Sequence, residues 1–292
     1  MLPRCQLISN IYGITVPEQS ELKANTLLET DTIFVRNVRC NGACRHHSPQ
    51  ECASSTYLVY PYRGLHMRHV GSDQSVADAN HVLFFNANES YQVSHPLPGG
   101  DASLSLRLSE SLLYEPAPPA LRHKSGTGFQ HQHHRIDPRA QALVALLRHS
   151  LEIGTIEPLE AESLTLTLIC RSLGTRTSRP PSSTQACRKL ADRVKVLLAS
   201  DLSRRWTLAE IAAEIRCSPV YLTQIFQQTE GLPLYQYQLR LRLARALDLL
   251  SHYDDLSALA AELGFSSHSH FAAAFRHAYG RTPSVFKQSA GT

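Results

Sequence analysis

The sequence predicts an α+β fold: a small β-rich N-terminal domain, then a helix pair, then an all-helical C-terminal domain. Three observations lead to this prediction. Short apolar runs separated by turn residues occupy residues 32–108, two apolar stretches with helical periodicity follow, and one short pattern occurs twice in the last third of the chain. With 292 residues, 42% of them hydrophobic and 18% charged, the chain is globular and long enough for two domains.

Residues 1–120 have the pattern of a small β-barrel or jelly roll. Their strand-like runs are short and rich in β-branched and aromatic residues, and Gly, Pro or Asn bound them. Many short strands at such spacing are typical of these two architectures, because closure or sheet pairing covers the strand edges. The predicted strands cover residues 32–38, 56–60, 65–70, 81–85, 91–93 and 103–108.

Two helices are predicted within residues 137–174. Asp137 is a good N-cap and Pro138 fits a first helical turn, and a second helix opens at Glu157 with the proline after it. The pair is so apolar that it must pack against another surface, which is either a second subunit, giving a homodimer, or the chain's own barrel. Residues 175–186 offer nothing to bury, so their composition predicts a flexible linker.

The first copy of the repeated pattern spans residues 207–226 and predicts two short helices joined by a tight turn. Thr207 followed by Glu210 forms a capping box at the start of the first helix. Ser218 is the N-cap of the second helix, and Pro219 stands at its first position, where a missing N–H costs nothing. Helical spacing then points four side chains of that second helix outward: Val220, Thr223, Gln224 and Gln227.

The second copy spans residues 255–275 and repeats the tetrad 211–214 at 259–262 without a gap. Ser267 caps its second helix. A single helix-turn-helix pattern is weak evidence, because any small helical hairpin can produce it, but a tandem copy with matching caps and cores is specific. The outward positions of the second copy are His268, Ser269, Ala272, Ala273 and Arg276.

The segment between the two copies, residues 233–250, is predicted to form one helix. Eighteen residues at 1.5 Å each span roughly 27 Å. Such a helix suits a pair of recognition helices that must lie about one DNA turn, roughly 34 Å, apart.

Residues 187–290 resemble the DNA-binding domain of the AraC family of bacterial transcription regulators. The resemblance covers this whole region and implies a seven-helix domain whose two recognition helices enter successive major grooves on one face of the DNA. Gln224 and Ala273 depart from it, because an arginine is frequent at both positions. The residues that carry the resemblance are Trp206-Thr-Leu, Ile211-Ala212, Cys217-Ser-Pro, Leu222, Phe226, Leu263 to Phe271, Phe275 and Thr282-Pro283.

The resemblance implies a transcription factor, of activator or repressor type, and not an enzyme. Its implied partners are double-stranded promoter DNA and RNA polymerase. In this family a cupin-like sensor domain often precedes the DNA-binding domain, so residues 1–120 are expected to sense a small molecule, a metal or a redox signal. The family's helix pairs often join two subunits, which supports the homodimer alternative for residues 137–174.

The distribution of charge agrees with DNA binding by the C-terminal part. The net charge is +4, and residues 187–292 hold 13 Lys and Arg against 9 Asp and Glu, whereas residues 1–186 hold 16 of each. No apolar run reaches the length of a membrane span, and the N-terminus lacks a signal-peptide pattern. We therefore expect a cytoplasmic protein without a membrane partner.

One cluster of cysteines and histidines lies just after the first predicted strand. Thiols and imidazoles at this spacing can bind Zn²⁺ or another soft metal, or the thiols can form a redox-sensitive pair, or the segment is a surface loop with no metal. The candidate ligands are Cys40, Cys44, His46 and Cys52.

Other residues of these types receive plainer interpretations. His95 joins such a site only if the fold brings it near Cys44. Cys170 and Cys217 occupy apolar helix positions and are expected in the core. The histidines at 131, 133 and 134 lie in a polar stretch before a helix and are expected to be solvated.

Three classes of function compete at this stage. The spacing of Cys40 and Cys44 is similar to that of the metal-bound, alkyl-accepting cysteines of DNA-repair regulators with an AraC-like tail, but the further Cys-x-x-Cys pair of that type is absent. A cupin oxygenase requires His-x-His, and His66 and His69 have the wrong spacing. An architectural nucleic-acid protein requires a larger basic surplus. The regulator is the preferred interpretation.

Overall fold

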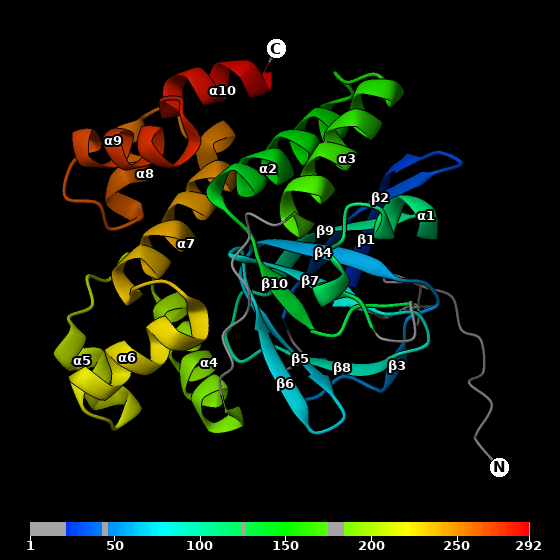
Figure 1. Ribbon diagram of the computed structural model, residues 1–292. Helices are drawn as coiled ribbons and strands as arrows, with labels where there is room; N and C mark the ends of the chain where they lie inside the picture. The colour runs from blue at the N-terminus through cyan, green and yellow to red at the C-terminus, as the bar shows by residue number, and fades with distance from the viewer. Residues whose placement is uncertain (1–21, 43–45, 124–126, 175–183, 292) are drawn as a thin grey trace.

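The computed structural model describes residues 22–42, 46–123, 127–174 and 184–291. Its N-terminal part consists of two antiparallel sheets that pack face to face, and its C-terminal part is helical (Figure 1). One sheet has the strand order β1-β2-β9-β4-β7-β10, and the other has the order β3-β8-β5-β6. The strands are β1 (Leu22–Glu29), β2 (Ile33–Cys40), β3 (Glu51–Cys52), β4 (Tyr57–Arg63), β5 (His66–Val70), β6 (Asp73–Ala77), β7 (His81–Phe85), β8 (Ser90–Ser94), β9 (Asp101–Leu108) and β10 (His133–Arg135).

All six predicted strands are present, and they correspond to β2, β4, β5, β7, β8 and β9. β4 runs on through Pro61, which the sequence suggested as its end. The pairing of β4 with β7 stops at Val59, so the missing N–H of Pro61 interrupts no bond to β7, and the register to β9 shifts between Pro61 and Arg63. Four strands were not predicted: β1, β3, β6 and β10.

The helix pair is α2 (Pro138–Ile153) and α3 (Pro158–Leu173). As predicted, Asp137 caps α2, and its side chain accepts a hydrogen bond from the backbone N–H of Ala140. Of the two alternatives for its apolar surface, the structure shows the second: both helices pack on the six-stranded sheet and share one core with it. The surface that led us to expect a homodimer is thus largely covered by the chain itself, although Leu159 stays 75% exposed.

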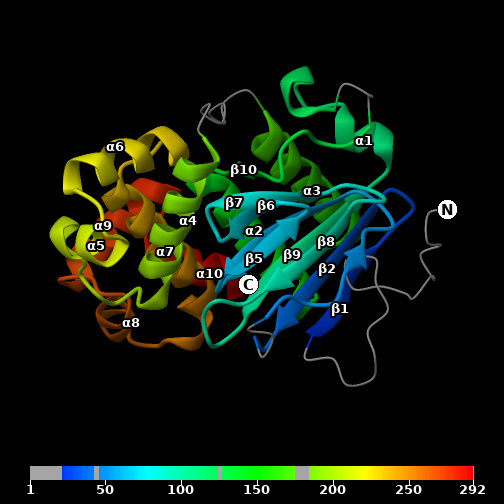
Figure 2. The same ribbon diagram turned by 90° about the horizontal axis from the view of Figure 1, so that it is seen from below.

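Seven α-helices form the described part of the C-terminal region, as the resemblance implied (Figure 2). Thr184 caps the first of them, so the helix begins at Gln185, inside the range predicted as linker; residues 175–183 lie outside the described residues. The helices are α4 (Gln185–Ser200), α5 (Leu208–Ile215), α6 (Pro219–Glu230), α7 (Leu234–Leu249), α8 (Leu256–Glu262), α9 (His268–Tyr279) and α10 (Pro283–Gly291). Three short helical elements complete the fold: α1 (Glu110–Tyr114), η1 (Pro119–Leu121) and η2 (Leu250–His252).

The two copies of the repeated pattern form the pairs α5–α6 and α8–α9, each with its own core. α7 connects them, since Tyr237 at its start packs in the first core and Leu247 near its end packs in the second. In the first core Phe226 is fully buried, and in the second Phe275 takes the matching place. None of the described helices has the length and hydropathy that a membrane crossing requires.

Candidate functional site

The first recognition helix is α6, and its local structure follows the predicted pattern. Thr207 and Glu210 form the capping box of the preceding helix α5. The side chain of Ser218 accepts a hydrogen bond from the N–H of Tyr221 at 3.2 Å, which satisfies one free donor at the start of α6. Between the two helices, Arg216 adopts the left-handed conformation (φ 61°), which turns the chain sharply.

The predicted DNA-facing residues of α6 lie on its outer surface. Val220, Gln224 and Gln227 are exposed, whereas Thr223 is half-buried. The hydroxyl of Thr223 donates to the carbonyl oxygen of Pro219 at 2.9 Å, so it can offer DNA only an acceptor and a methyl group. The amide of Gln224 is the most versatile hydrogen-bonding group on this face.

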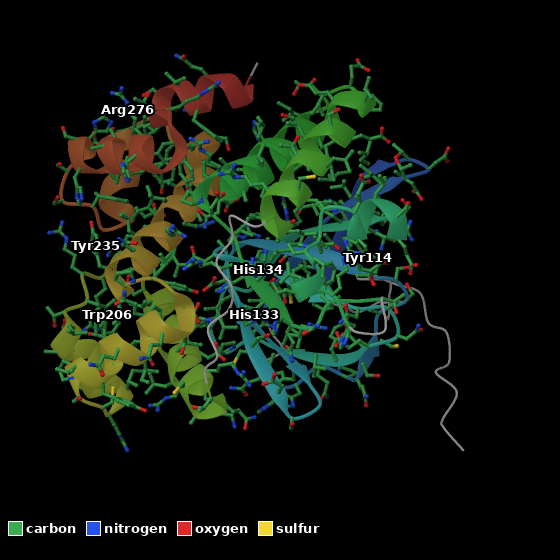
Figure 3. The ribbon with its side chains drawn as sticks, viewed as in Figure 1. Tyr114, His133, His134, Trp206, Tyr235 and Arg276 are labelled. Carbon is green, nitrogen blue, oxygen red and sulfur yellow. The ribbon has the colours of Figure 1, made fainter. Side chains whose placement is uncertain are left out.

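The second recognition helix is α9, and it begins in the same way. Ser267 accepts a hydrogen bond from the N–H of His270 at 3.1 Å. His268, Ser269, Ala273 and Arg276 are exposed, and Ala272 is half-buried. The face of α9 therefore carries smaller side chains than that of α6. Figure 3 shows Arg276 on the side of the helical region that is turned away from the sheets.

Exposed aromatic residues near α6 were missed by the sequence reasoning. Tyr221 is 48% exposed on α6 and Tyr235 is 64% exposed at the start of α7. Together with Val220, which is 68% exposed, they give this face apolar surface as well as amide groups. An aromatic residue at a non-core position of an amphipathic helix was the available signal.

The end of α6 that points toward the N-terminal domain is held by buried charges. Glu230, the last residue of α6, accepts from Nζ of Lys195 on α4 at 2.6 Å and from Nε2 of His81 on β7 at 3.2 Å. Nη1 of Arg135 on β10 donates to the backbone oxygen of Glu230 at 2.6 Å. Burial and the helix dipole both disfavour a carboxylate at this position. Lys195 and His81 nevertheless hold the pKa of Glu230 below its ordinary value.

His81 lies between two carboxylates. Its Nδ1 is 2.9 Å from Oδ1 of Asp78, while its Nε2 faces Glu230, so both ring nitrogens act as donors and the ring carries a charge. Burial opposes that charge, but Asp78 and Glu230 outweigh burial and raise the pKa of His81. The hydroxyl of Tyr237 on α7 also donates to Asp78. A loop of the N-terminal domain is thereby bonded to α6 and α7 at once. We call Asp78, His81, Lys195, Glu230 and Tyr237 the interdomain network.

The prediction that His133 and His134 are solvated is wrong. Both belong to β10, a strand that pairs with β7, and they lie between the sheets and the helical region (Figure 3). Burial and the nearby charge of His81 lower the pKa of His134 to about 4 and the pKa of His133 well below its ordinary value. These histidines are neutral parts of the domain contact.

The second helix-turn-helix unit meets the N-terminal part through α2. Ala145 of α2 belongs to the same core as Leu247 and Phe275. The hydroxyl of Tyr279 at the end of α9 donates to Oε1 of Gln141 at 3.4 Å. Nearby, Arg148 of α2 pairs with Asp248 of α7 at 3.1 Å.

The predicted cysteine cluster is only partly reproduced. Cys44 lies outside the described residues, His46 is exposed, and Cys52 pairs with Ser90 in the strand ladder. Within the described part of the chain, Cys40 groups instead with His95 and Asp101, and this potential metal-binding group includes neither His46 nor Cys52.

The expectation of core positions for the two other cysteines holds for one of them. Cys217 is half-buried and packs against the first helix-turn-helix core. Cys170 is exposed, because it lies on the outer side of α3.

Comparisons with known proteins agree with this geometry. A family model described as a helix-turn-helix domain matches residues 211–289. The chain is 34% identical over 99 residues to the uncharacterized HTH-type transcriptional regulator YidL of Escherichia coli, which is 34% of this chain and 33% of the relative. It is 31% identical over 120 residues to the regulatory protein PocR of Salmonella typhimurium (40% and 38%), and 32% identical over 121 residues to the HTH-type transcriptional activator RhaR of E. coli (41% and 42%).

Some similar solved structures cover only about a third of this chain, and others cover most of it. A DNA-binding transcriptional dual regulator from E. coli is 30% identical with a TM-score of 0.33, covering 35% of this chain and 92% of that one. The DNA-binding domain of AdpA in complex with a target DNA is 24% identical with a TM-score of 0.32 (34% and 90%). ToxT from Vibrio cholerae covers 89% of this chain and 98% of its own, at 12% identity and a TM-score of 0.37.

The C-terminal region is thus a helix-turn-helix DNA-binding domain. More particularly, it is similar to the domains of the HTH-type regulators named above, as expected for the AraC type that its sequence resembles. The chain spans only a third to about two fifths of the length of these relatives, all three of which are named as regulators.

Proposed function

We propose that this chain is a sequence-specific transcription regulator of the AraC type, not an enzyme, whose N-terminal domain transmits a signal to the DNA-binding domain. The observation that carries the proposal is the pair of capped recognition helices with exposed polar faces, one of which is bonded to the N-terminal domain at its far end. Promoter DNA is the partner of the two helices, and RNA polymerase is the partner at the promoter. The signal is a small molecule, a metal or a redox change.

In the proposed DNA complex, α6 and α9 have different roles. The amide of Gln224 can pair with adenine in the major groove, and Val220 can contact a thymine methyl group. His268 and Ser269 stand at the start of α9, where free backbone N–H groups attract phosphate. The small Ala272 and Ala273 bring the backbone of α9 close to DNA but read little sequence. Arg276 adds an electrostatic contact to phosphate.

The interdomain network supports the signalling part of the proposal. Two recognition helices bind together only when they lie about one DNA turn, roughly 34 Å, apart. α6 is bonded to β7 and β10 through Glu230, whereas α9 is packed on α2. A signal that alters either contact changes the relative position of the two helices. We propose residues 1–120 as the sensor, residues 137–174 as the helix pair and residues 187–290 as the DNA-binding domain.

Selection of binding sites from random DNA with the full chain tests the proposal. We expect two sequence boxes about one helical turn apart. Gln224→Ala should weaken binding by about 1–3 kcal/mol at one base position and relax the preference there. Gln50→Ala changes an exposed glutamine of the N-terminal domain and is the matched control, which should leave the consensus unchanged. No enriched sequence with the wild type would overturn the regulator, and an unaltered consensus in Gln224→Ala would overturn the role of that residue.

A further inference from the structure

Three chemically different side chains meet at one end of the β-sandwich. Cys40 ends β2 and Asp101 begins β9, and these two residues are direct partners in the strand ladder. His95 follows the last residue of β8, which belongs to the other sheet. The connection from β8 to β9 therefore carries His95 from one sheet to the edge of the other, next to the Cys40–Asp101 pair.

Glycine makes this approach possible. Gly100, immediately before Asp101, has φ 68°, and a Cβ atom there would lie 1.9 Å from the backbone oxygen of Cys40. A Cβ on Gly42 would lie 2.6 Å from Gly100 in turn. Only residues without side chains allow the two backbones to come this close, so the loop holds Cys40 and Asp101 tightly together.

The ligand atoms of the three residues converge. Sγ of Cys40, a ring nitrogen of His95 and a carboxylate oxygen of Asp101 all lie within 4.8 Å of one another. Zinc bonds of 2.0–2.3 Å in a tetrahedron place ligand atoms about 3.3–3.8 Å apart, so small side-chain shifts suffice. Nε2 of His95 is 2.7 Å from Oδ1 of Asp101. Nδ1 of the same ring is buried without a hydrogen-bond partner among the described residues, which is rare in folded proteins, and an ion or a water at the site would satisfy it.

Neighbouring groups orient this set as they do around bound metals. His66 on β5 is 2% exposed, and its Nδ1 is 3.0 Å from Oδ2 of Asp101. The N–H of Gly42 donates to Sγ of Cys40 at 3.4 Å and so holds the sulfur in place. Hydrogen bonds from a second layer to metal ligands fix their orientation, and their loss typically costs 10–100-fold in metal affinity.

We propose that Cys40, His95 and Asp101 bind a divalent transition-metal ion, with Zn²⁺ as the ion that this sulfur, nitrogen and oxygen set fits best. Three protein ligands leave the fourth position open to water or to a small ligand. The site identifies the metal among the signals considered for the N-terminal domain. Metal binding itself does not depend on the proposed function; only its regulatory meaning does.

Cobalt titration of the chelator-treated full chain tests the site. We expect about one equivalent of Co²⁺ to bind and to produce a thiolate-to-cobalt charge-transfer band, which Zn²⁺ then removes. Cys40→Ser should abolish the band. Cys52→Ser, the matched control from the originally predicted cluster, should retain it. His66→Gln should keep the band but weaken the affinity 10–100-fold, because His66 orients Asp101 without binding the metal.

Two results would overturn the site: no thiolate band in the wild type, or a band that survives in Cys40→Ser. A DNA-binding assay on the same samples separates this inference from the function. If the chain binds a specific DNA sequence but no cobalt, the metal site is refuted and the proposed regulator function is retained. Cobalt binding by a chain that binds no DNA sequence supports the metal site and refutes the regulator.

Discussion

The two helix-turn-helix units share one sequence pattern, but different kinds of interaction hold them against the N-terminal domain. The first unit is held by buried charges, because Glu230 of α6 contacts Lys195 and His81. The second unit is held mainly by packing, with Ala145 of α2 in the same core as Phe275. A packed contact tolerates small changes in charge, whereas a buried ion network responds strongly to the loss of one partner or of one proton. We therefore propose that the first unit is the one that a signal releases.

The exposed faces of the two recognition helices also differ, in the side chains that they present. α6 presents amide and apolar groups that can read bases, and α9 presents small residues and an arginine that suit the DNA backbone. Under the proposed function, the unit that reads the sequence is thus the unit with the charge-dependent attachment. Four predictions test this difference, from the largest expected effect to the smallest.

Removing Glu230 should have the largest effect. Glu230→Ala leaves Lys195 buried beside Asp192 alone, so the free energy of unfolding should fall by about 3–5 kcal/mol. Urea denaturation followed by circular dichroism measures this change. The control Glu214→Ala removes an exposed carboxylate from α5 and should change the free energy by less than about 0.5 kcal/mol. Equal effects for the two variants would contradict the importance of the network.

Acid should weaken the domain contact through His134. Its pKa in the folded chain is about 4, below the ordinary value of 6.5, so the stability it contributes is present above pH 6.5 and is lost as the pH falls toward 4. By pH 5 the expected loss is about 2 kcal/mol. His81 has a raised pKa and acts in the opposite direction, since its contribution is complete below pH 6.5 and is lost at higher pH.

Urea midpoints at pH 7 and pH 5 provide the measurement for this second prediction. His134→Gln should remove about 2 kcal/mol of the difference between the two pH values. His252→Gln, at an exposed histidine far along the chain, is the control and should leave the difference as in the wild type. A pH dependence that persists in full in His134→Gln would assign the acid sensitivity to other groups.

Arg276 on α9 should affect DNA binding without affecting sequence preference. Arg276→Ala should weaken binding to all sequences alike and lower the slope of log K against log salt by about one, because one phosphate contact is lost. Fluorescence anisotropy at several salt concentrations measures the slope. Lys23→Ala, at an exposed residue of β1, should leave it unchanged. A change of consensus in Arg276→Ala would instead make α9 a reader of bases.

The smallest effect is expected for self-association. The exposed apolar residues Ile153 and Leu159 flank the turn between α2 and α3, and we propose that two subunits meet there in a homodimer. Leu159→Asp should lower the association constant in sedimentation equilibrium while changing the free energy of unfolding by less than about 0.5 kcal/mol. Ser163→Asp, one turn further along α3 and also exposed, serves as a charge control. A wild-type chain that is monomeric at micromolar concentration would contradict the dimer.

The sequence by itself determined the features that depend on neighbouring residues. The capping box at Thr207, the caps at Ser218 and Ser267, and the start of α2 after Asp137 all lie where they were predicted. Each depends on groups within three or four positions, so the spacing in the chain already contains the geometry. The same holds for the repeated cores, because helical periodicity places their apolar residues on one face.

Only the tertiary structure decided which distant groups meet. β10 is three residues long and polar, and it forms a strand because it pairs antiparallel with β7. That pairing buries His134 and half-buries His133, both of which look solvated in the sequence. Glu230 meets His81 across 149 positions, and Cys40 meets Asp101 across 61. No periodicity encodes such pairs, because their distance depends on how two sheets and two domains pack, and that packing depends on the whole chain at once.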